Sequence, residues 1–375
     1  MEAGLEKTLV FLLFIFLGLI LKSKFKSIQE INGIKKIILN LALPATIFIA
    51  LLGIKIEASL LLLPIMALVF NVLLFAISPF LLPIVGVKKN TPAYRTARLL
   101  VPSLAPGLSC FPFILEFLGE DYLAKAAMAD LGNKVFVLIV LYLIAMHWFY
   151  SRNQESRKGG KAKLYSLFKT LVTEPVNLFI GAALFLLLLG FNMESLPFVI
   201  SDSLSKLSLM MTPLVLLFIG LAVKIKKHQF TEILSLLLLR AGLVFLLTSV
   251  FVLISGLSVQ SEILLMLSFG LSACSFWPFA HLSLVDGLES EKKSKTFDSN
   301  YAVSILALSF PLSTVLILGV LNSGGVLGTP GIIFISGIIL CALGSIFPLI
   351  KVLSKKASKL RFASTKIETA TTERV

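Results

Sequence analysis

The sequence predicts an all-α polytopic membrane protein, built as an inverted repeat of five transmembrane helices (5+5) plus one extra C-terminal helix. Three observations lead to this fold class: the composition, the uneven distribution of basic residues and a weak internal repeat. The chain of 375 residues is 57% hydrophobic and only 14% charged, with a mean hydropathy of +0.97. A soluble domain needs about 25% charged residues to cover its surface. The composition therefore excludes an ordinary cytosolic enzyme and a disordered chain.

Apolar runs divide the chain into eleven candidate membrane spans. A spanning helix needs roughly 20 apolar residues, because lipid leaves every backbone polar group to be bonded inside the helix. The expected spans are 8–21, 37–54, 59–86, 99–118, 132–150, 175–192, 204–223, 231–257, 262–285, 301–321 and 331–353. They define five parts: a first five-helix repeat (1–150), a basic linker (151–174), a second, inverted repeat (175–321), an extra helix (322–353) and a basic tail (354–375).

The basic residues set the expected orientation of these spans. The formal net charge is +14, and the Lys and Arg residues fall between apolar runs, which points to membrane topology rather than to a nucleic-acid partner. Loops after odd-numbered spans, together with the C-terminal tail, hold 28 of them, and the opposite side holds 5. By the positive-inside rule, the N-terminus lies outside and the C-terminus in the cytoplasm, with the chain in the inner (cytoplasmic) membrane.

The two halves of the chain match at an offset of roughly 166–176 residues. Four matches occur in the same order: Leu41-Ala-Leu-Pro44 with Met210-Met-Thr-Pro213, Leu60-Leu-Leu-Leu-Pro64 with Leu236-Leu-Leu-Leu-Arg240, Ser109–Phe113 with Cys274–Phe279, and Asp130–Asn133 with Asp298–Asn300. Because five is an odd number, the second copy enters the bilayer in the opposite orientation. Inverted repeats of this kind serve alternating access in transporters.

The fourth and ninth spans are expected to be broken helices. Pro102, Pro106, Gly107 and Pro112 fall close together in the fourth span, and each proline removes a helix donor and clashes with the preceding turn. The matching part of the ninth span has Gly270 and Pro278 around Ser272, Cys274 and Ser275. Paired interruptions point to a transporter site, since half-helix N-termini expose N–H groups that suit a carboxylate. The alternative is that these prolines only kink their helices.

A few other polar residues lie at membrane depth. Arg240 either holds an anionic substrate or reaches toward the interface. Asn40, Asn133 and Asn300 either line the site or link helices, and a link is the simpler role for Asn71. His281 is a candidate proton carrier, although a lone histidine beside an apolar helix is more often structural. We expect Asp130, at the outer end of its span, to contact water.

Motifs for hydrolysis and metal binding are missing from the sequence. It has no phosphate-binding G-x-x-x-x-G-K-[ST] loop, no H-E-x-x-H and no nucleophile elbow. Cys110, Cys274 and Cys341 show neither a C-x-x-C pair nor metal-ligand spacing. We therefore expect no enzymatic activity, no cofactor and no metal site, and we expect any transport to be driven by a gradient.

The sequence resembles the auxin efflux carrier family of the bile acid:sodium symporter-like superfamily. The resemblance covers roughly residues 8–321 and rests on four stretches: Asn40–Pro44, Pro106–Pro112, Phe117–Asn133 and Trp277-Pro278. It implies a scaffold of the first, second, sixth and seventh helices, which the family uses to form a homodimer. It also implies a mobile core, in which the two broken helices cross beside an organic anion. Two departures are Ala105, where the family has Asn, and the eleventh span.

Together these arguments favour a secondary active transporter or uniporter that exports a small organic anion by elevator-like alternating access. The candidate substrate-binding residues are Ala105, Pro106, Gly107, Ser109, Cys110, Pro112, Ser275, Trp277, Pro278, Asn40, Asn133, Asn300 and Arg240. One alternative is a sodium-coupled symporter of the bile acid type. Sodium prefers oxygen ligands with a buried carboxylate, which the ninth span lacks between Glu262 and Asp286. Another alternative is a membrane sensor without flux.

Overall fold

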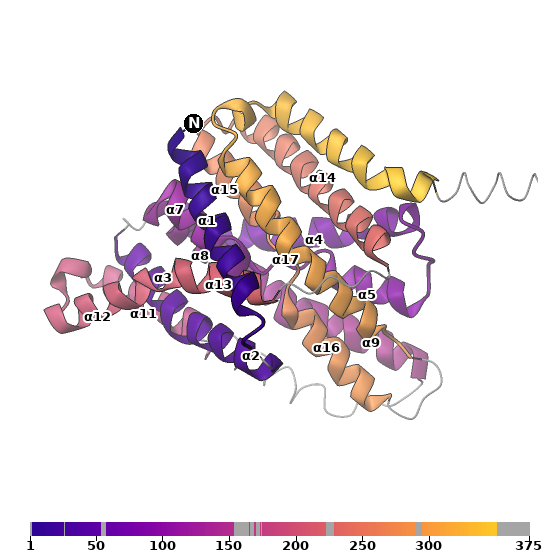
Figure 1. The fold of residues 1–375 in the computed structure, drawn as a ribbon, viewed down its shortest axis with the longest axis horizontal. Helices are drawn as coiled ribbons and strands as arrows, with labels where there is room; N and C mark the ends of the chain where they lie inside the picture. Colours follow the sequence, from indigo (N-terminus) through magenta and orange to yellow (C-terminus); the bar gives the residue numbers. More distant parts are fainter. Residues whose placement is uncertain are drawn as a thin grey trace, which may run out of the picture.

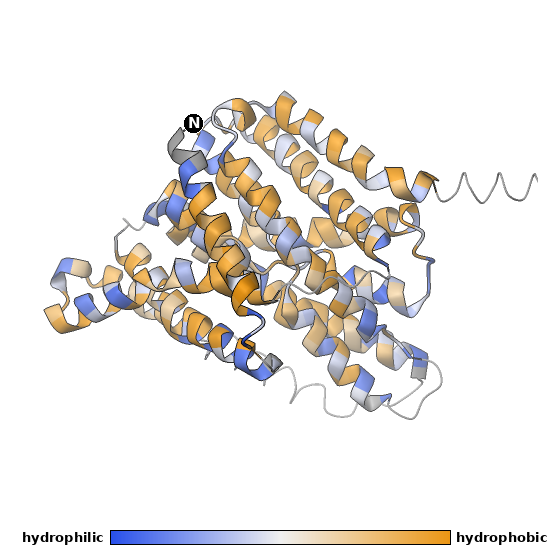
Figure 2. Ribbon diagram, in the orientation of Figure 1, coloured by the Kyte–Doolittle hydropathy of each residue, from blue (hydrophilic) through white to orange (hydrophobic). Residues whose placement is uncertain are grey.

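The computed structural model describes residues 2–25, 27–53, 58–153, 175–222, 229–289 and 295–350, together with residues 165, 169 and 173. All regular structure within these residues is helical, and seven of the described helices are long and apolar enough to cross a membrane. By length and composition, the chain is a multi-pass membrane protein. Apolar residues cover most of each helix and polar residues gather at helix ends (Figure 2). Most of the basic linker and the whole basic tail lie outside the described residues.

The first half of the chain forms three long helices, two of which contain a π-helical segment, and several shorter ones. Its α-helices are α1 (Glu2–Leu21), α2 (Ile28–Ile37), α3 (Leu43–Leu52), α4 (Ala58–Ile84), α5 (Pro92–Leu100), α6 (Pro106–Ser109), α7 (Phe111–Leu118), α8 (Glu120–Val135) and α9 (Leu141–Asn153). The π-helical segment η1 (Ile38–Ala42) joins α2 to α3, and η2 (Phe136–Val140) joins α8 to α9.

The second half is built from a similar succession of helices. They are α11 (Pro175–Leu188), α12 (Phe198–Leu209), α13 (Met211–Ala222), α14 (Phe230–Ser255), α15 (Gln260–Gly270), α16 (Phe276–Leu288) and α17 (Ser299–Leu321), with short 3-10 turns at Met193–Ser195 and Val326–Gly328. A last helix, Pro330–Ile350, follows. It runs alongside α14 at the upper right of Figure 1.

The eleven expected spans correspond to three kinds of element. The seven long apolar helices are Gln29–Leu52, Leu60–Ile84, Glu120–Arg152, Phe198–Leu221, Phe230–Ser255, Ser299–Leu321 and Pro330–Ile350. Two further spans are the shorter apolar helices Leu9–Leu21 and Pro175–Leu188. The remaining two, expected at 99–118 and 262–285, are divided into short helices.

Some helices begin well before the apolar run that predicted them. The helix expected to start at residue 37 starts at Ile28, where the Ser27 side chain accepts a hydrogen bond from the Glu30 N–H. The helix expected to start at residue 132 starts at Glu120. Hydropathy detects only the apolar part of a helix, so polar turns at its start are assigned to loops. This difference places several charged residues inside helices.

Glycines bring two pairs of helices into close backbone contact. α1 packs against α13, and a Cβ added to Gly220 would lie 2.8 Å from the Gly18 Cα. α4 packs against α8, where a Cβ on Gly132 would clash with the Pro64 backbone. α11 packs against α3. Small residues allow helices in a membrane to approach closely and gain van der Waals contact.

The last helix attaches to α14 through the same kind of contact. A Cβ on Gly242 of α14 would lie 2.8 Å from the Gly337 carbonyl oxygen, and a Cβ on Gly344 would lie 2.9 Å from the Leu239 nitrogen. The rest of this helix exposes large apolar side chains, such as Ile335 and Leu349. In a bilayer these side chains would contact lipid.

Prolines interrupt some helices and are accommodated in others. α4 continues through Pro64, Pro79 and Pro83, and α17 continues through Pro311. Membrane helices tolerate such prolines because neighbouring groups satisfy the freed carbonyls. In contrast, the chain leaves the helical conformation at residues 101–105 and at residues 271–275. The prolines of α4 and α17 thus lie within continuous helices. In the fourth and ninth spans the helix is interrupted, so the alternative that their prolines only kink a helix does not hold.

Candidate functional site

The two interruptions, far apart in the sequence, lie against each other. Residues 101–105 connect α5 to α6, and residues 271–275 connect α15 to α16. The Ala105 N–H donates a hydrogen bond to the Ala273 carbonyl oxygen over 2.9 Å. Non-helical backbone at membrane depth is stable only where its polar groups find partners within the protein. Each interruption therefore supplies hydrogen-bond partners for backbone groups of the other.

Serine side chains satisfy further backbone groups of the interruptions. Ser103 Oγ accepts a hydrogen bond from the Ser275 N–H at 3.0 Å. Ser109 Oγ accepts one from the Ala273 N–H at 2.9 Å and donates to the Ala105 carbonyl at 2.8 Å. A serine hydroxyl can donate and accept at once, so each one links two backbone groups. These serines are structural partners of the interruptions.

Arg240 joins the two interruptions from α14. Its side chain is buried, with 4% of its surface exposed. Nε donates to the Val101 carbonyl at 2.7 Å, and Nη2 donates to the Ser272 carbonyl at 2.9 Å and the Ser103 carbonyl at 3.4 Å. Arg240 is thus engaged with backbone carbonyls and does not line the cavity described below. It also does not extend to an interface, which was the alternative expected from the sequence.

Asn133 of α8 forms a second polar link. Its amide nitrogen donates to the Leu104 carbonyl at 3.0 Å and to Asp130 Oδ1 at 2.8 Å. Its amide oxygen accepts from the Asn71 amide at 2.9 Å, which connects α4 to α8. Both N–H donors of Asn133 are used, so this residue is better suited to hold the interruption in place than to bind an anion.

A cavity of about 410 Å³ opens beside both interruptions. One side is formed by the interruptions and the helices that follow them, and the opposite side by apolar residues of η1, α3, α11 and α13. Three charged side chains also line it: Lys35 of α2, and Asp130 and Lys134 of α8. The other lining residues are Leu39, Leu43, Leu104, Ala105, Pro106, Gly107, Leu108, Asn133, Val137, Val176, Phe218, Cys274, Ser275, Phe276, Trp277, Ala280, Leu306 and Phe310.

The charged groups give the cavity an excess of positive charge. Lys134 Nζ lies 3.5 Å from Asp130 Oδ2 and donates to Asn177 Oδ1 at 2.9 Å. Lys35 Nζ lies 4.6 Å from the centroid of the Phe276 ring. Two ammonium groups and one carboxylate leave a net charge suited to a monoanion. The low dielectric of a buried site strengthens such an attraction.

These charged residues were not predicted as site residues. In the sequence analysis Lys35 belongs to the cytoplasmic side of the charge count and Lys134 to the opposite side, and Asp130 is expected to contact water. In the structure Asp130 is 5% and Lys134 7% exposed. Both lie inside α8, which begins at Glu120, well before the apolar run that starts at residue 132. The i,i+4 spacing of Asp130 and Lys134 is the sequence signal that could have identified them as a pair on one helix face.

Six of the predicted substrate-binding residues line this cavity: Ala105, Pro106, Gly107, Asn133, Ser275 and Trp277. Gly107 lies where α6 meets α3, and a Cβ there would come within 2.9 Å of Leu43 Cδ2. Ser275 caps α16, since its Oγ accepts from the Trp277 N–H at 3.3 Å. The predicted site and the cavity therefore share the first residues of α6 and α16.

The other predicted residues lie outside the cavity lining. Four of them are buried in the protein interior: Ser109, Cys110, Pro112 and Pro278. The two prolines lie in the first turns of α7 and α16. Asn40 and Asn300 are exposed on the surface of the described structure. The His281 ring nitrogen Nε2 lies 2.9 Å from the Val137 carbonyl, and its ring packs against Tyr142. The surroundings of His281 fit a structural histidine.

The described residues contain no group of three or more His, Cys, Asp or Glu side chains able to hold a metal ion. The cavity instead brings together two lysines, one aspartate and several aromatic side chains. Such a set can bind a small anion with an apolar body. Comparison of the chain with protein-family models and with curated proteins finds no match.

Proposed function

We propose that the chain is a secondary active transporter or uniporter, which exports a small carboxylate across the cytoplasmic membrane by elevator-like alternating access. One observation carries this proposal: a cavity of about 410 Å³, with Lys35 and Lys134 in its wall, touches both helix interruptions. Sites for small molecules typically measure about 300–1,000 Å³ and hold a few polar groups in an apolar lining. The cavity has both properties.

Two features would attract the carboxylate. The first is the N-terminus of α16, where Ser275, Phe276 and Trp277 face the cavity. The Ser275 and Trp277 N–H groups already donate to serine oxygens, so the attraction at this end of α16 comes from the partial positive charge of the helix dipole. The second is Lys134, which lies 3.5 Å from Asp130 and would exchange its Asn177 partner for the substrate. The balance of charges favours a monocarboxylate over a dicarboxylate.

An inverted repeat is part of the proposal, and the packing of the helices supports it. In such a repeat, the first and second spans correspond to the sixth and seventh. The contact of α1 with α13 then corresponds to the contact of α11 with α3, and both contacts are extensive. The interruptions at 101–105 and 271–275 also differ by an offset within the range of the sequence repeat. These parallels favour the architecture implied by the resemblance to the auxin efflux carriers.

The proposed movement separates the two sides of the cavity. Lys35, Leu39, Leu43, Val176 and Phe218 come from the elements assigned to a scaffold. The remaining lining residues come from the interrupted helices and from helices bonded to them. Arg240 fastens both interruptions to α14, and Asn133 fastens the first one to α8, so these parts would move as one body with the substrate.

Flux measurements in proteoliposomes test the proposal. Uptake of radiolabelled mono- and dicarboxylates would be followed while sodium, pH and voltage gradients are varied one at a time. We expect uptake of a monocarboxylate that does not depend on sodium. Strict sodium dependence would instead favour a symporter of the bile acid type, and binding without flux of any anion would favour a sensor.

A matched pair of variants on α8 links flux to the cavity. Lys134→Gln removes a cavity charge, and Lys125→Gln removes a lysine of the same helix that pairs with Glu262 at 2.8 Å outside the cavity. We expect Lys134→Gln to lower uptake at least tenfold, the effect of about 1.4 kcal/mol of lost binding. Lys125→Gln should stay near the wild-type rate. Equal rates in the two variants would contradict the proposed site.

A further inference from the structure

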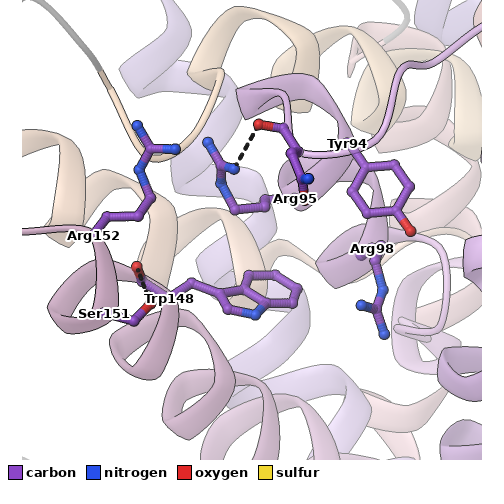
Figure 3. Close-up of a pocket in the computed structure, with 7 residues that line it drawn as sticks. Tyr94, Arg95, Arg98, Trp148, Ser151 and Arg152 are labelled. Carbon is purple, nitrogen blue, oxygen red and sulfur yellow. Dashed lines mark hydrogen bonds between the residues drawn. The ribbon is translucent and has the colours of Figure 1, made fainter.

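A second pocket lies away from the cavity, between α5 and the end of α9. It has a volume of about 300 Å³ and is lined by Asn90, Tyr94, Arg95, Arg98, Trp148, Ser151 and Arg152. Figure 3 shows three guanidinium groups around it, with those of Arg95 and Arg152 on the same side above Trp148. It shares no lining residue with the cavity of the candidate transport site. Arginine, with its planar fork of donors, is the residue best matched to phosphate oxygens.

Arg95 is held in this pocket with one donor unused. Its side chain is 8% exposed, Nε donates to the Thr296 carbonyl at 2.7 Å, and Nη1 donates to the Asn90 carbonyl at 2.9 Å. Its Nη2 is buried without a hydrogen-bond partner. Burial, and then repulsion from Arg152, lower the pKa of Arg95 to about 10, against the opposing effect of Glu289. Arg95 is therefore protonated at neutral pH and has a free N–H to offer.

Arg98 is fixed by aromatic rings on two sides. Its guanidinium carbon lies 4.4 Å from the centroid of Phe75 and 5.4 Å from that of Trp148. Such cation–π contacts orient the group but leave its N–H donors available. Arg98 Nε is buried and has no hydrogen-bond partner. Buried unsatisfied donors are rare, so two of them in one pocket indicate that an acceptor binds there.

An apolar hollow adjoins the basic pocket. It measures about 350 Å³ and is lined by Phe75, Arg98, Leu143, Ile144, His147 and Trp148. Arg98 and Trp148 line both hollows. Leu143 is 45% exposed, so the apolar hollow lies at the outer surface of the helices, where lipid would be. A ligand that fills both parts has an anionic group at one end and a hydrocarbon chain at the other.

We propose that these two hollows together bind an anionic phospholipid, with its phosphate between Arg95, Arg98 and Arg152 and an acyl chain along Phe75 and Leu143. The pocket lies on the side of the membrane that the basic loops predict to be cytoplasmic. Basic pockets between membrane helices on this side are suited to anionic headgroups. Free phosphate shares the headgroup chemistry but would leave the apolar hollow empty. The proposal does not depend on the transport function.

Quenching of Trp148 fluorescence by brominated lipids tests this site. The chain has two tryptophans, so Trp277→Phe leaves Trp148 as the single reporter. The full-length variant would be placed in phosphatidylcholine nanodiscs with increasing amounts of phosphatidylglycerol that carries bromine on its acyl chains. Brominated phosphatidylcholine serves as the headgroup control. We expect the anionic lipid to reach half-maximal quenching at about tenfold lower mole fraction than the control lipid.

Charge variants show whether the arginines make this preference. Arg152→Gln and Arg98→Gln should each abolish it, and Lys89→Gln, which removes a charge from the exposed loop beside the pocket, should retain it. If Arg98→Gln fails to fold, Arg152→Gln and the headgroup comparison still decide the outcome. Equal quenching by both lipids would overturn the proposal. Relief of quenching by millimolar inorganic phosphate would assign the pocket to a free anion and would also overturn it.

Discussion

Replacing Arg240 with Met tests whether the two interruptions depend on each other. The substitution keeps an unbranched apolar side chain in α14 but removes every donor of the guanidinium. The carbonyls of Val101 and Ser272 then lose their partners, which are 2.7 and 2.9 Å away in the structure. Neither carbonyl can gain a replacement partner from a helix N–H, since both lie in the non-helical segments 101–105 and 271–275.

The size of the effect follows from these two short bonds. A hydrogen bond from a charged donor contributes about 1.5–3 kcal/mol, so two of them contribute roughly 3–6 kcal/mol. The third bond, at 3.4 Å, adds little. Removing the buried charge also removes its desolvation cost, which offsets part of the loss. We expect a net decrease of about 3 kcal/mol in the free energy of unfolding, which is more than a hundredfold in the equilibrium constant.

Unfolding of the purified protein in mixed micelles of increasing SDS content measures this change. The fluorescence of Trp277, which lies just after the second interruption, reports on the region that Arg240 holds. Arg240→Lys should recover only part of the loss, because one ammonium group cannot span carbonyls on both segments. Lys125→Met is the control, since it removes a cation whose side chain is 33% exposed and whose ion pair contributes about 0–1 kcal/mol.

The reasoning fails if Arg240→Met and Lys125→Met unfold at the same SDS content. It also fails if Arg240→Met is destabilised but Arg240→Lys is fully stable, because the charge and not the bridging geometry would then matter. A substrate-binding role for Arg240 would give a third result: normal unfolding with lost transport.

Three further predictions concern glycines, prolines and one asparagine of the helices. Gly242→Leu should displace the last helix from α14 and lower the free energy of unfolding by about 2 kcal/mol or more. Gly181→Leu is the control, because a Cβ at Gly181 has no neighbour within 4 Å, and it should leave stability unchanged. The same SDS titration compares the two variants. Pro112→Ala and Pro278→Ala should each impair carboxylate flux while membrane insertion stays intact, because alanine would let α7 join α6 across Cys110 and would let α16 extend back into residues 271–275. Wild-type flux in both variants would count against the site. Asn71→Leu removes the partner of the Asn133 oxygen and should cost about 1–3 kcal/mol in the unfolding assay, and a stable variant would contradict the link between α4 and α8.

The membrane character and the positions of the interruptions could be predicted from the sequence. Both depend on local properties of the chain: the length of apolar runs, and prolines and glycines that occur too densely for a helix. The prolines of α4 show the limit of this argument, because a single proline is compatible with a continuous helix. The dense cluster in 102–112 is not, and the chain leaves the helix there.

The side chains of the cavity were harder to predict, because the sequence gives the depth of a residue but not the direction it faces. Asn40 and Asn300 are polar residues at suitable depths, yet both are exposed. Arg240 faces inward, but its N–H groups donate to the carbonyls of Val101 and Ser272 and are not directed at a ligand. Lys35 and Lys134 lie near the ends of expected spans, where the positive-inside rule reads a lysine as a sign of topology and not as a site residue. Helix rotation and true helix length are set by tertiary packing, which a single sequence does not display.

The glycine contacts between α1 and α13 restrict how an elevator could operate in this chain. The close approach of Gly18 to Gly220 packs α1 tightly on α13, and both helices belong to the proposed scaffold. In an elevator the displacement would instead occur at the scaffold surface that lines the cavity, where Leu43 and Phe218 present aliphatic and aromatic side chains. The bond from Lys134 to Asn177 crosses that surface. If the chain transports a carboxylate as proposed, a substrate that drew Lys134 away from Asn177 would lower the barrier to this movement, and the empty protein would move more slowly than the loaded one.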